Sequence, residues 1–300
     1  MHFVQRKDID CDKWNQLVDQ TPCALIYNKS FFLDILADNW CIYVDDDYSK
    51  GIALPFTSRL KVNTVYTPNF IRSFDILGIN PGNILNEFIE SDSLKFRNGN
   101  LILNVQSNLG VLQFKKFQQI PSINHFEINT LAKRMLKKFD SLEYDMNQSV
   151  SLDRVLHFFK IELFPRISNL NSKDYNLFSN LLRELDKQGA LKMNCIVNGN
   201  KELIAVAVFM EYKNRVTYIK GVATHNLMKN GAMYALLYNE IIKTREKNFD
   251  FDFGGSNIES ISRFYKNLGG QDEYYSSLEW GDLPRYYKVV RGIYHKLSNK

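Results

Sequence analysis

The sequence predicts an α/β (α+β) protein built from mixed, mostly antiparallel twisted sheets that are flanked by helices. Two observations in the second half carry this prediction. First, the apolar residues of 190–223 fall into three strand-length runs separated by short turns, and the middle run is nearly all apolar, as in a strand covered on both faces. Second, the apolar period becomes helical after Ala223, returns to two in FDFDF (249–253), and then becomes helical again. The resulting order is β-β-β-α-β-α-β.

The second half gives the clearer elements. Asn198-Gly199-Asn200 suits a tight hairpin turn, and Gly189 suits the position just after a helix. In the last helix we expect one buried side, made by Ile258, Ile261, Phe264 and Leu268. The spacing predicts helices over 152–167, 172–189, 231–248 and 257–268, and strands over 190–197, 203–212, 215–223, 249–253 and 273–280.

The first half repeats a similar order of elements without repeating individual residues. The polar stretch from Asp140 to Ser151 is the expected boundary, which gives domains of 1–145 and 146–300. The expected helices are near 12–20, 28–38, 80–91 and 131–140, and the expected strands are 40–44, 49–56, 60–67, a hairpin over 94–105, 113–120 and 125–129.

Composition favours a packed protein of two domains. Of the 300 residues, 45% are hydrophobic and 24% are charged, so disorder is not expected. No apolar run approaches the roughly 20 residues of a membrane span, and the N-terminus has no apolar signal segment. The four cysteines are widely spaced and the histidines form no metal-binding pattern, so we expect a cytoplasmic protein without a metal.

The net charge of +5 is mild. Its largest local excess is PRYYKVVRGIYHKLSNK (284–300), which has five Lys/Arg and no acid, with apolar residues at helical spacing. A helix that docks on the protein explains this segment better than a nucleic-acid or membrane tail. We therefore expect no nucleic-acid partner, and the sequence does not determine the oligomeric state.

The start of the helix at 231 is a candidate phosphate site. Unpaired N–H groups at a helix N-terminus attract anions, and a glycine lets an anion approach the backbone. Lys229, Asn230, Gly231 and Ala232 would form this cradle, with Val222 assigned to the same site from the preceding strand. The alternative is an ordinary glycine at the start of a helix.

A second candidate is FDFDFGGSN (249–257). Asp250 and Asp252 project from one strand face, where repulsion and burial would raise the pKa of one carboxyl toward that of a general base. The alternative is a pair of solvated carboxylates. Ser256 and Glu259 match a helix-capping box, which we favour over a catalytic role for either residue.

Aromatic residues supply the remaining candidates. Tyr265 follows Phe264 and so lies near the border of the apolar face of the last helix, where its phenol could reach the sheet. An aromatic at a packing seam is the alternative. In the first half, Tyr66 and Phe70 are candidates for lining an acceptor cleft, the kind of concave place where ligands commonly bind.

The element order and RFYKNLGG (263–270) resemble the GNAT acyltransferases, in which a tyrosine four residues before a glycine protonates the departing thiolate. Tyr265 precedes Gly269 by this spacing, whereas Gly270 stands where phenylalanine is usual. MKNGAM (228–233) keeps the central glycine of the family's pyrophosphate loop, with methionines at both ends.

A closer resemblance is to the FemAB/FemX-like branch, which joins two GNAT-like domains in one chain. It rests on 251–270 and on WNQLVDQTP, DDDYSKGIALPF and YTPNF in the first half. The resemblance implies a degenerate N-terminal domain and a C-terminal domain with the donor site. The long helical arm with which FemX-type members hold aminoacyl-tRNA has no counterpart in the sequence.

This resemblance implies an N-acyltransferase that uses acyl-CoA, or a related donor, as cosubstrate and a small-molecule or peptide amine as acceptor. Asp252 would accept the proton of the amine and Tyr265 would protonate the leaving group, while Gly254, Gly255 and Asn257 would contact substrate. Two alternatives stay open: an inactive GNAT-like protein that binds a ligand or partner, and a FemX-type aminoacyl or peptidyl transferase.

Overall fold

The chain forms two compact units in the computed structural model. The first comprises 1–115 with 274–300, and the second comprises 116–273. These bounds differ from the division at 145/146 that the sequence suggests, because α4 (Thr130–Asp140) packs on α8 (Ala232–Glu246) within the second unit. The residues that the structure describes are 1–59, 62–79, 84, 87–88, 96, 98–104, 112–121, 125–142, 144–146, 149–168 and 170–281, with the side chains of 112–118 and 228 excepted.

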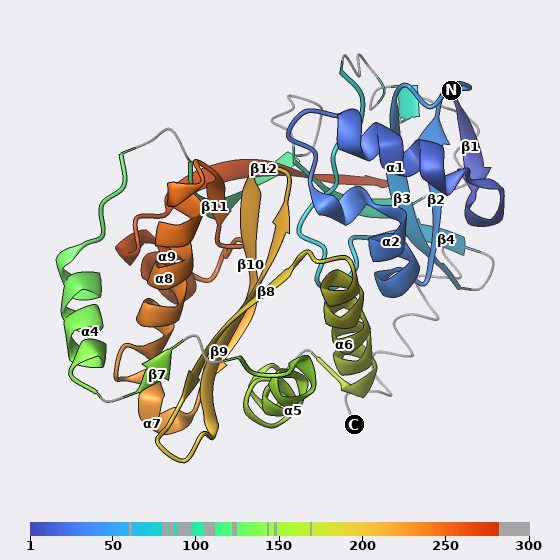
Figure 1. Ribbon diagram of the computed structural model, residues 1–300. Coiled ribbons are helices and arrows are strands. Elements are labelled where there is room, and N and C mark those ends of the chain that lie inside the picture. Colours follow the sequence, from blue (N-terminus) through green and yellow to red (C-terminus); the bar gives the residue numbers. More distant parts are fainter. Residues whose placement is uncertain are drawn as a thin grey trace. The chain divides into compact units, whose positions relative to one another are not determined.

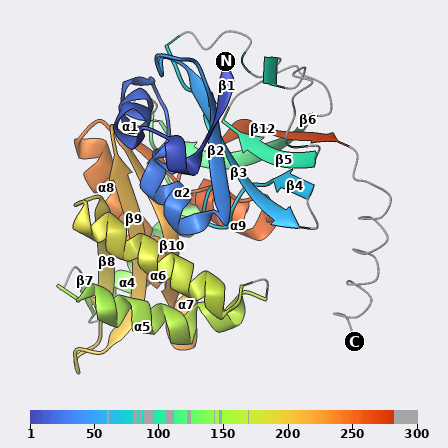
Figure 2. The same ribbon diagram turned by 90° about the vertical axis from the view of Figure 1, so that its right-hand side faces the viewer.

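The sheet of the first unit has the strand order β1-β2-β3-β4-β5-β12. Its neighbours are antiparallel except β4 and β5, which are parallel. Helices α1 and α2 lie over β2 (Figure 2), where Trp14 and Phe32 are fully buried. The elements are β1 (His2–Gln5), α1 (Cys11–Gln20), α2 (Ser30–Leu36), β2 (Asn39–Val44), β3 (Gly51–Arg59), β4 (Val62–Val65), β5 (Asn98–Leu103) and β12 (Gln271–Gly281), with short 3₁₀ helices at Arg6–Asp8 and Ile26–Asn28.

The sheet of the second unit has the order β6-β11-β10-β9-β8-β7, in which only β10 and β11 are parallel. Asn171 and Asp174 form a capping box that starts α6. Besides α4 and α8, the elements are β6 (Leu112–Ile120), β7 (Asp145–Met146), α5 (Leu152–Glu162), a 3₁₀ helix at Phe164–Arg166, α6 (Ser172–Lys187), β8 (Leu191–Val197), β9 (Leu203–Tyr212), β10 (Arg215–Ala223), α7 (His225–Met228), β11 (Asp250–Asp252) and α9 (Glu259–Asn267).

Helices cover both faces of this second sheet (Figure 1). On one face, α8 packs over β8 to β11, and Asn194 of β8 donates hydrogen bonds to Leu236 O and Glu240 on α8. The other face is covered by α5 and α6, which lie side by side (Figure 2). Strands buried between two helical layers are expected to be apolar along most of their length, as β9 is over residues 203–210. The predicted mixed α/β fold with flanking helices is therefore confirmed.

Several local predictions are wrong. Ile258 and Ile261 are 61% and 37% exposed instead of buried. The capping box is not formed, because α9 begins at Glu259 and Ser256 accepts a hydrogen bond from the N–H of Ile258. The hairpin's positive φ falls on Lys201 rather than on 198–200, and 125–129 forms no strand. The predicted C-terminal helix at 284–300 and most of the helix at 80–91 lie outside the described residues.

Candidate functional site

Strands β10 and β11 run side by side for three residue pairs and then part (Figure 1). The last pair is Thr217 with Asp252, after which β10 continues to Ala223 while β11 ends. A bulge interrupts the pairing of β10 with β9 between Tyr218 and Lys220. Such bulges bend a strand and redirect its side chains. Backbone groups of β10 beyond Thr217 thus lose their β11 partner, which makes this the place where a ligand could hydrogen-bond to a strand.

Glycines make the parting possible. Gly254 and Gly255 have φ of +73° and +85°, a left-handed conformation that other residues rarely adopt. A Cβ on Gly254 would lie 2.6 Å from the carbonyl oxygen of Tyr218, so only glycine fits beside β10. The substrate contacts expected of Gly254 and Gly255 stay a prediction. The crowding by Tyr218 nevertheless explains why the sequence has a glycine at position 254.

Asp252 is completely buried, and both of its carboxylate oxygens accept hydrogen bonds. Its Oδ1 accepts a hydrogen bond from the N–H of Gly254 at 2.8 Å, and its Oδ2 accepts one from Arg215 Nη1 at 2.8 Å. Arg215 also lies 3.8 Å from Asp250 and 3.9 Å from Glu273. Burial alone would lower the pKa of Arg215, but Asp252 and the other carboxylates outweigh it and raise the pKa.

Arg215 changes the expected electrostatics of the strand. The sequence pattern predicts only repulsion between the carboxylates of Asp250 and Asp252. It misses the guanidinium of Arg215, which lies close to both carboxylates. The position of Arg215 opposite Asp250 on the neighbouring strand follows from the β10–β11 register, which the sequence does not reveal. Asp252 therefore takes part in an ion-paired network, and its role as proton acceptor stays a prediction.

Tyr265 lies on the buried side of α9 and is only 7% exposed. Its ring stacks on Phe253 with centroids 4.7 Å apart and meets the edge of Tyr218 at 6.3 Å. Burial, and then the charge of Asp252, raise the pKa of Tyr265. The phenol thus stays protonated at neutral pH and is available as a proton donor beside the parting of the strands.

The predicted phosphate cradle packs against α4. Gly231 has φ +86°, and a Cβ there would collide with the carbonyl oxygen of Met135 on α4. Lys138 of the same helix donates a hydrogen bond to Lys229 O at 3.0 Å, while Ala232 is completely buried. Close packing of α4 therefore explains the glycine without an anion. Asn230 donates to Asn226 O, and Val222 is 5% exposed on β10.

The remaining predicted residues lie in two places. Asn257 is exposed in the loop between β11 and α9, two residues after Gly255. Tyr66 and Phe70 belong to the first unit and are half-buried. The phenol oxygen of Tyr66 accepts a hydrogen bond from the N–H of Asp38 at 2.9 Å, and Phe70 has φ +70°.

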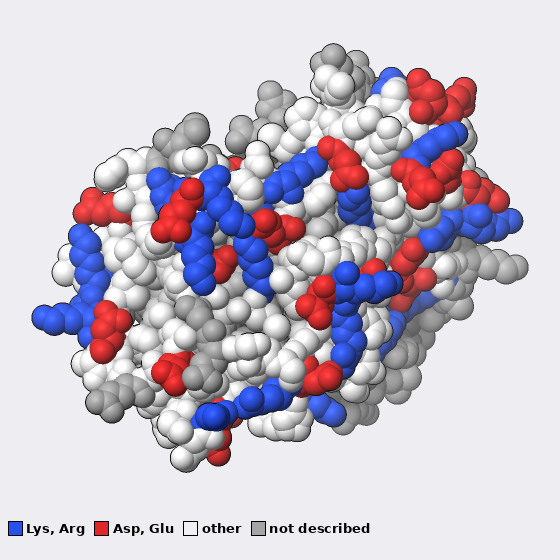
Figure 3. Space-filling model, viewed as in Figure 1, with Lys and Arg blue, Asp and Glu red and all other residues white. Residues whose placement is uncertain are grey.

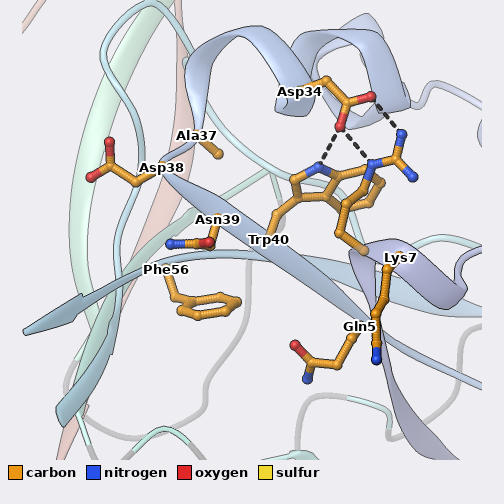
Figure 4. A pocket seen from close by; sticks show the side chains of 9 residues that line it. Gln5, Lys7, Asp34, Ala37, Asp38, Asn39, Trp40 and Phe56 are labelled. Carbon is orange, nitrogen blue, oxygen red and sulfur yellow. Dashed lines mark hydrogen bonds and ion pairs between the residues drawn. The ribbon is translucent and has the colours of Figure 1, made fainter. Parts of the chain in front are cut away.

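The first unit carries a pocket of about 350 Å³ whose lining includes Asp38 (Figure 4). One wall is a closed polar network in which Asp34 accepts hydrogen bonds from Arg6 at 2.6 and 2.8 Å and from Trp40 at 2.9 Å. Burial opposes ionisation of Asp34, but these hydrogen bonds outweigh it and lower its pKa. Because the polar groups of Asp34, Arg6 and Trp40 already hydrogen-bond to one another, this wall is better suited to binding a ligand by shape than to catalysis.

Other features bear on the kind of site. Within the described part of the chain, no group of three His, Cys, Asp or Glu is placed to hold a metal ion, and no helix combines the length and apolarity of a membrane span. On the face drawn in Figure 3, basic and acidic side chains are interspersed. That face offers no broad basic surface of the kind that binds nucleic acid.

The arrangement matches known structures along nearly the whole chain. FemX superposes with a TM-score of 0.64 at 12% identity, covering 92% of this chain and 97% of its own. The protein has the FemX fold. Proteins that share the FemX fold include L-PGS from Bacillus licheniformis (TM-score 0.60, 12% identity, 94% and 95% covered) and a GNAT-family acetyltransferase from Colwellia psychrerythraea (0.55, 8%, 93% and 100%). No protein-family model and no curated protein matches the sequence.

Proposed function

We propose that this chain transfers an acyl group from a donor such as acyl-CoA to an amine, at the parting of β10 and β11, with the donor site in residues 146–300. The observation that carries the proposal is the buried ring of Tyr265, which packs on Phe253 and Tyr218, the two residues that directly follow the last β10–β11 pair. Backbone N–H groups of β10 beyond the last β10–β11 pair would stabilise the oxyanion as the amine attacks the acyl carbonyl. Asp252, directly or through water, would accept the proton that the amine loses, and Tyr265 would protonate the leaving group.

In this proposal the main role of Asp252 is to position the turn that follows β11. Both of its oxygens are engaged, by Gly254 and Arg215, and these bonds fix the turn that opens the strands. Direct attack by the amine needs no covalent enzyme intermediate, which agrees with the absence of a nucleophile motif in the sequence.

The test is a mass-spectrometric search for acylated amines, with acetyl-CoA and longer acyl-CoAs as donors and a mixture of amino acids, small peptides and polyamines as acceptors. Tyr265→Phe should lower the rate about 100-fold or more, the usual contribution of a general acid. Tyr274→Phe is the matched control, because Tyr274 is 43% exposed and lies outside α9. Full activity of Tyr265→Phe would remove this residue from the mechanism.

Aminoacyl or peptidyl transfer of the FemX type is the second candidate. It is favoured by the packing of α4 on Gly231, which brings the carbonyl oxygen of Met135 to the glycine of the expected pyrophosphate loop. Thermal unfolding separates the two donors, since a ligand at 100 times its Kd adds about 2.7 kcal/mol to the free energy of unfolding. Stabilisation by aminoacyl-tRNA but by no acyl-CoA would replace the first candidate with the second.

A further inference from the structure

Lys220 occupies a special place on β10. It is the first residue after the bulge at Ile219, and it pairs with Val208 of β9 while Thr217 pairs with Met210. Because Val208 and Met210 are two residues apart on one strand, Lys220 and Thr217 project from the same face of the sheet. Asp252 lies opposite Thr217 in the last β10–β11 pair. Lys220 is therefore the first paired residue of β10 on this face beyond the point where the strands part.

The amine of Lys220 has no counter-ion within the chain as far as the structure describes it. It makes no hydrogen bond or ion pair there, although the residue is half-buried. Two other cations of the same sheet behave differently: Lys192 pairs with Glu211 and Glu240, and Arg215 pairs with Asp252. Burial lowers the pKa of Lys220, which reflects the cost of keeping a charge there without a partner.

Lys220 projects from the face of the sheet opposite to the one on which Tyr265, the proposed general acid, packs. Tyr265 stacks on Phe253, whose ring contacts Phe251, and Phe251 in turn contacts Phe209 in the layer under α8. Lys220 projects to the other side, where α5 packs on β9 and β10. If the leaving group departs toward Tyr265, the attacking amine approaches from the side of Lys220.

We propose that Lys220 binds an anionic group, carboxylate or phosphate, on the acceptor amine. The inference rests on the proposed acyl transfer, because it assigns this face to the acceptor. An anion supplied by the acceptor would give Lys220 the counter-ion that the described chain lacks, and would hold the amine at the opening between the strands. The acceptor class is then an amine that also carries an acid, such as an amino acid, a peptide with a free carboxylate or an aminoalkyl phosphate.

The experiment uses the full chain and two pairs of probes that differ in the anion alone. Glycylglycine is compared with glycylglycinamide, and phosphoethanolamine with ethanolamine. Trace acetylation by acetic anhydride reports each amine separately by peptide mass spectrometry. At ten times its Kd, an anionic probe should slow acetylation of Lys220 about tenfold by occupancy, while its neutral partner should not. The exposed Lys243 is the internal control, and its rate should stay constant.

Variants make the assignment specific. Lys220→Met should lose the thermal stabilisation that the anionic probes give, Lys220→Arg should retain most of it, and Lys243→Met should behave as the parent. Protection by one pair only identifies the anion as carboxylate or phosphate. The inference is overturned if no anionic probe protects Lys220, if the neutral partner protects equally, or if Lys220→Met keeps the stabilisation. If acyl transfer depends on Tyr265 but proceeds equally well with acceptors that lack an anion, this inference alone is overturned. If the anionic probes protect Lys220 but no acyl transfer is found, only the proposed function is overturned.

Discussion

Replacing Gly254 by alanine tests the structural reason for the parting of β10 and β11. Two costs add at this position. The left-handed φ of +73° costs a non-glycine residue about 1–2 kcal/mol, and the new Cβ would lie 2.6 Å from Tyr218 O, which does not yield as a flexible side chain would. Forcing extra volume into a packed place costs about 1–3 kcal/mol. Gly254→Ala should therefore lower the free energy of unfolding by about 2–5 kcal/mol.

Two other glycines separate these costs. Gly189 has φ +67°, but no atom lies within 4 Å of the place that a Cβ would take, so Gly189→Ala reports the backbone cost alone. Gly199 has neither a positive φ nor a near neighbour, and Gly199→Ala should change stability by less than about 0.5 kcal/mol. Urea denaturation followed by circular dichroism gives the three free energies in one assay.

The order of the three free energies of unfolding tests whether the carbonyl of Tyr218 crowds a Cβ at position 254. We expect Gly254→Ala to be the least stable, Gly189→Ala intermediate and Gly199→Ala close to the parent. If Gly254→Ala is no less stable than Gly189→Ala, the carbonyl of Tyr218 does not crowd the turn and the argument for an obligatory glycine at the strand opening is refuted.

Three further outcomes follow from buried polar groups. Asp252→Asn leaves the buried cation of Arg215 without its main partner and should cost about 3–5 kcal/mol in a denaturation experiment; an unchanged stability would contradict the ion pair. Because burial raises the pKa of Tyr265, the phenol loses its proton at a lower pH in the unfolded protein than in the folded protein. The free energy of unfolding should therefore fall as the pH rises above about 10, and it should fall less in Tyr265→Phe. Burial raises the pKa of Cys195 to about 12, so a thiol reagent should label the exposed Cys23 and spare Cys195 until the protein unfolds; early labelling of Cys195 would contradict its burial.

Much of the second unit could be predicted from local sequence patterns. The apolar run of β9 and the change of period after Ala223 both reflect which side chains face a core, and burial follows the period closely there. The sequence places Tyr265 only near the border of the apolar face of α9, whereas the structure buries it. The exposed Ile258 and Ile261 were missed because a helical apolar pattern does not say whether another element covers it.

The contacts between distant segments could not be predicted. Arg215 and Asp252 are brought together by strand register, and Gly231 meets Met135 because α4 packs over the start of α8. Both are long-range pairings that a single sequence does not encode in any local pattern. The sequence shows only a glycine before a helix at 231, and the structure adds that the carbonyl of Met135 lies beside it.

The connectivity of the first unit has a consequence for biosynthesis. Strand β5 needs residues 276–281 as its neighbour, and these follow the whole of the second unit in the chain. While the ribosome makes residues 116–273, the earlier strands of the first sheet can pair, but β5 keeps an open edge that another chain could join. A nascent polypeptide stalled before residue 276 should therefore associate through this edge, and completion of β12 is the step that closes it.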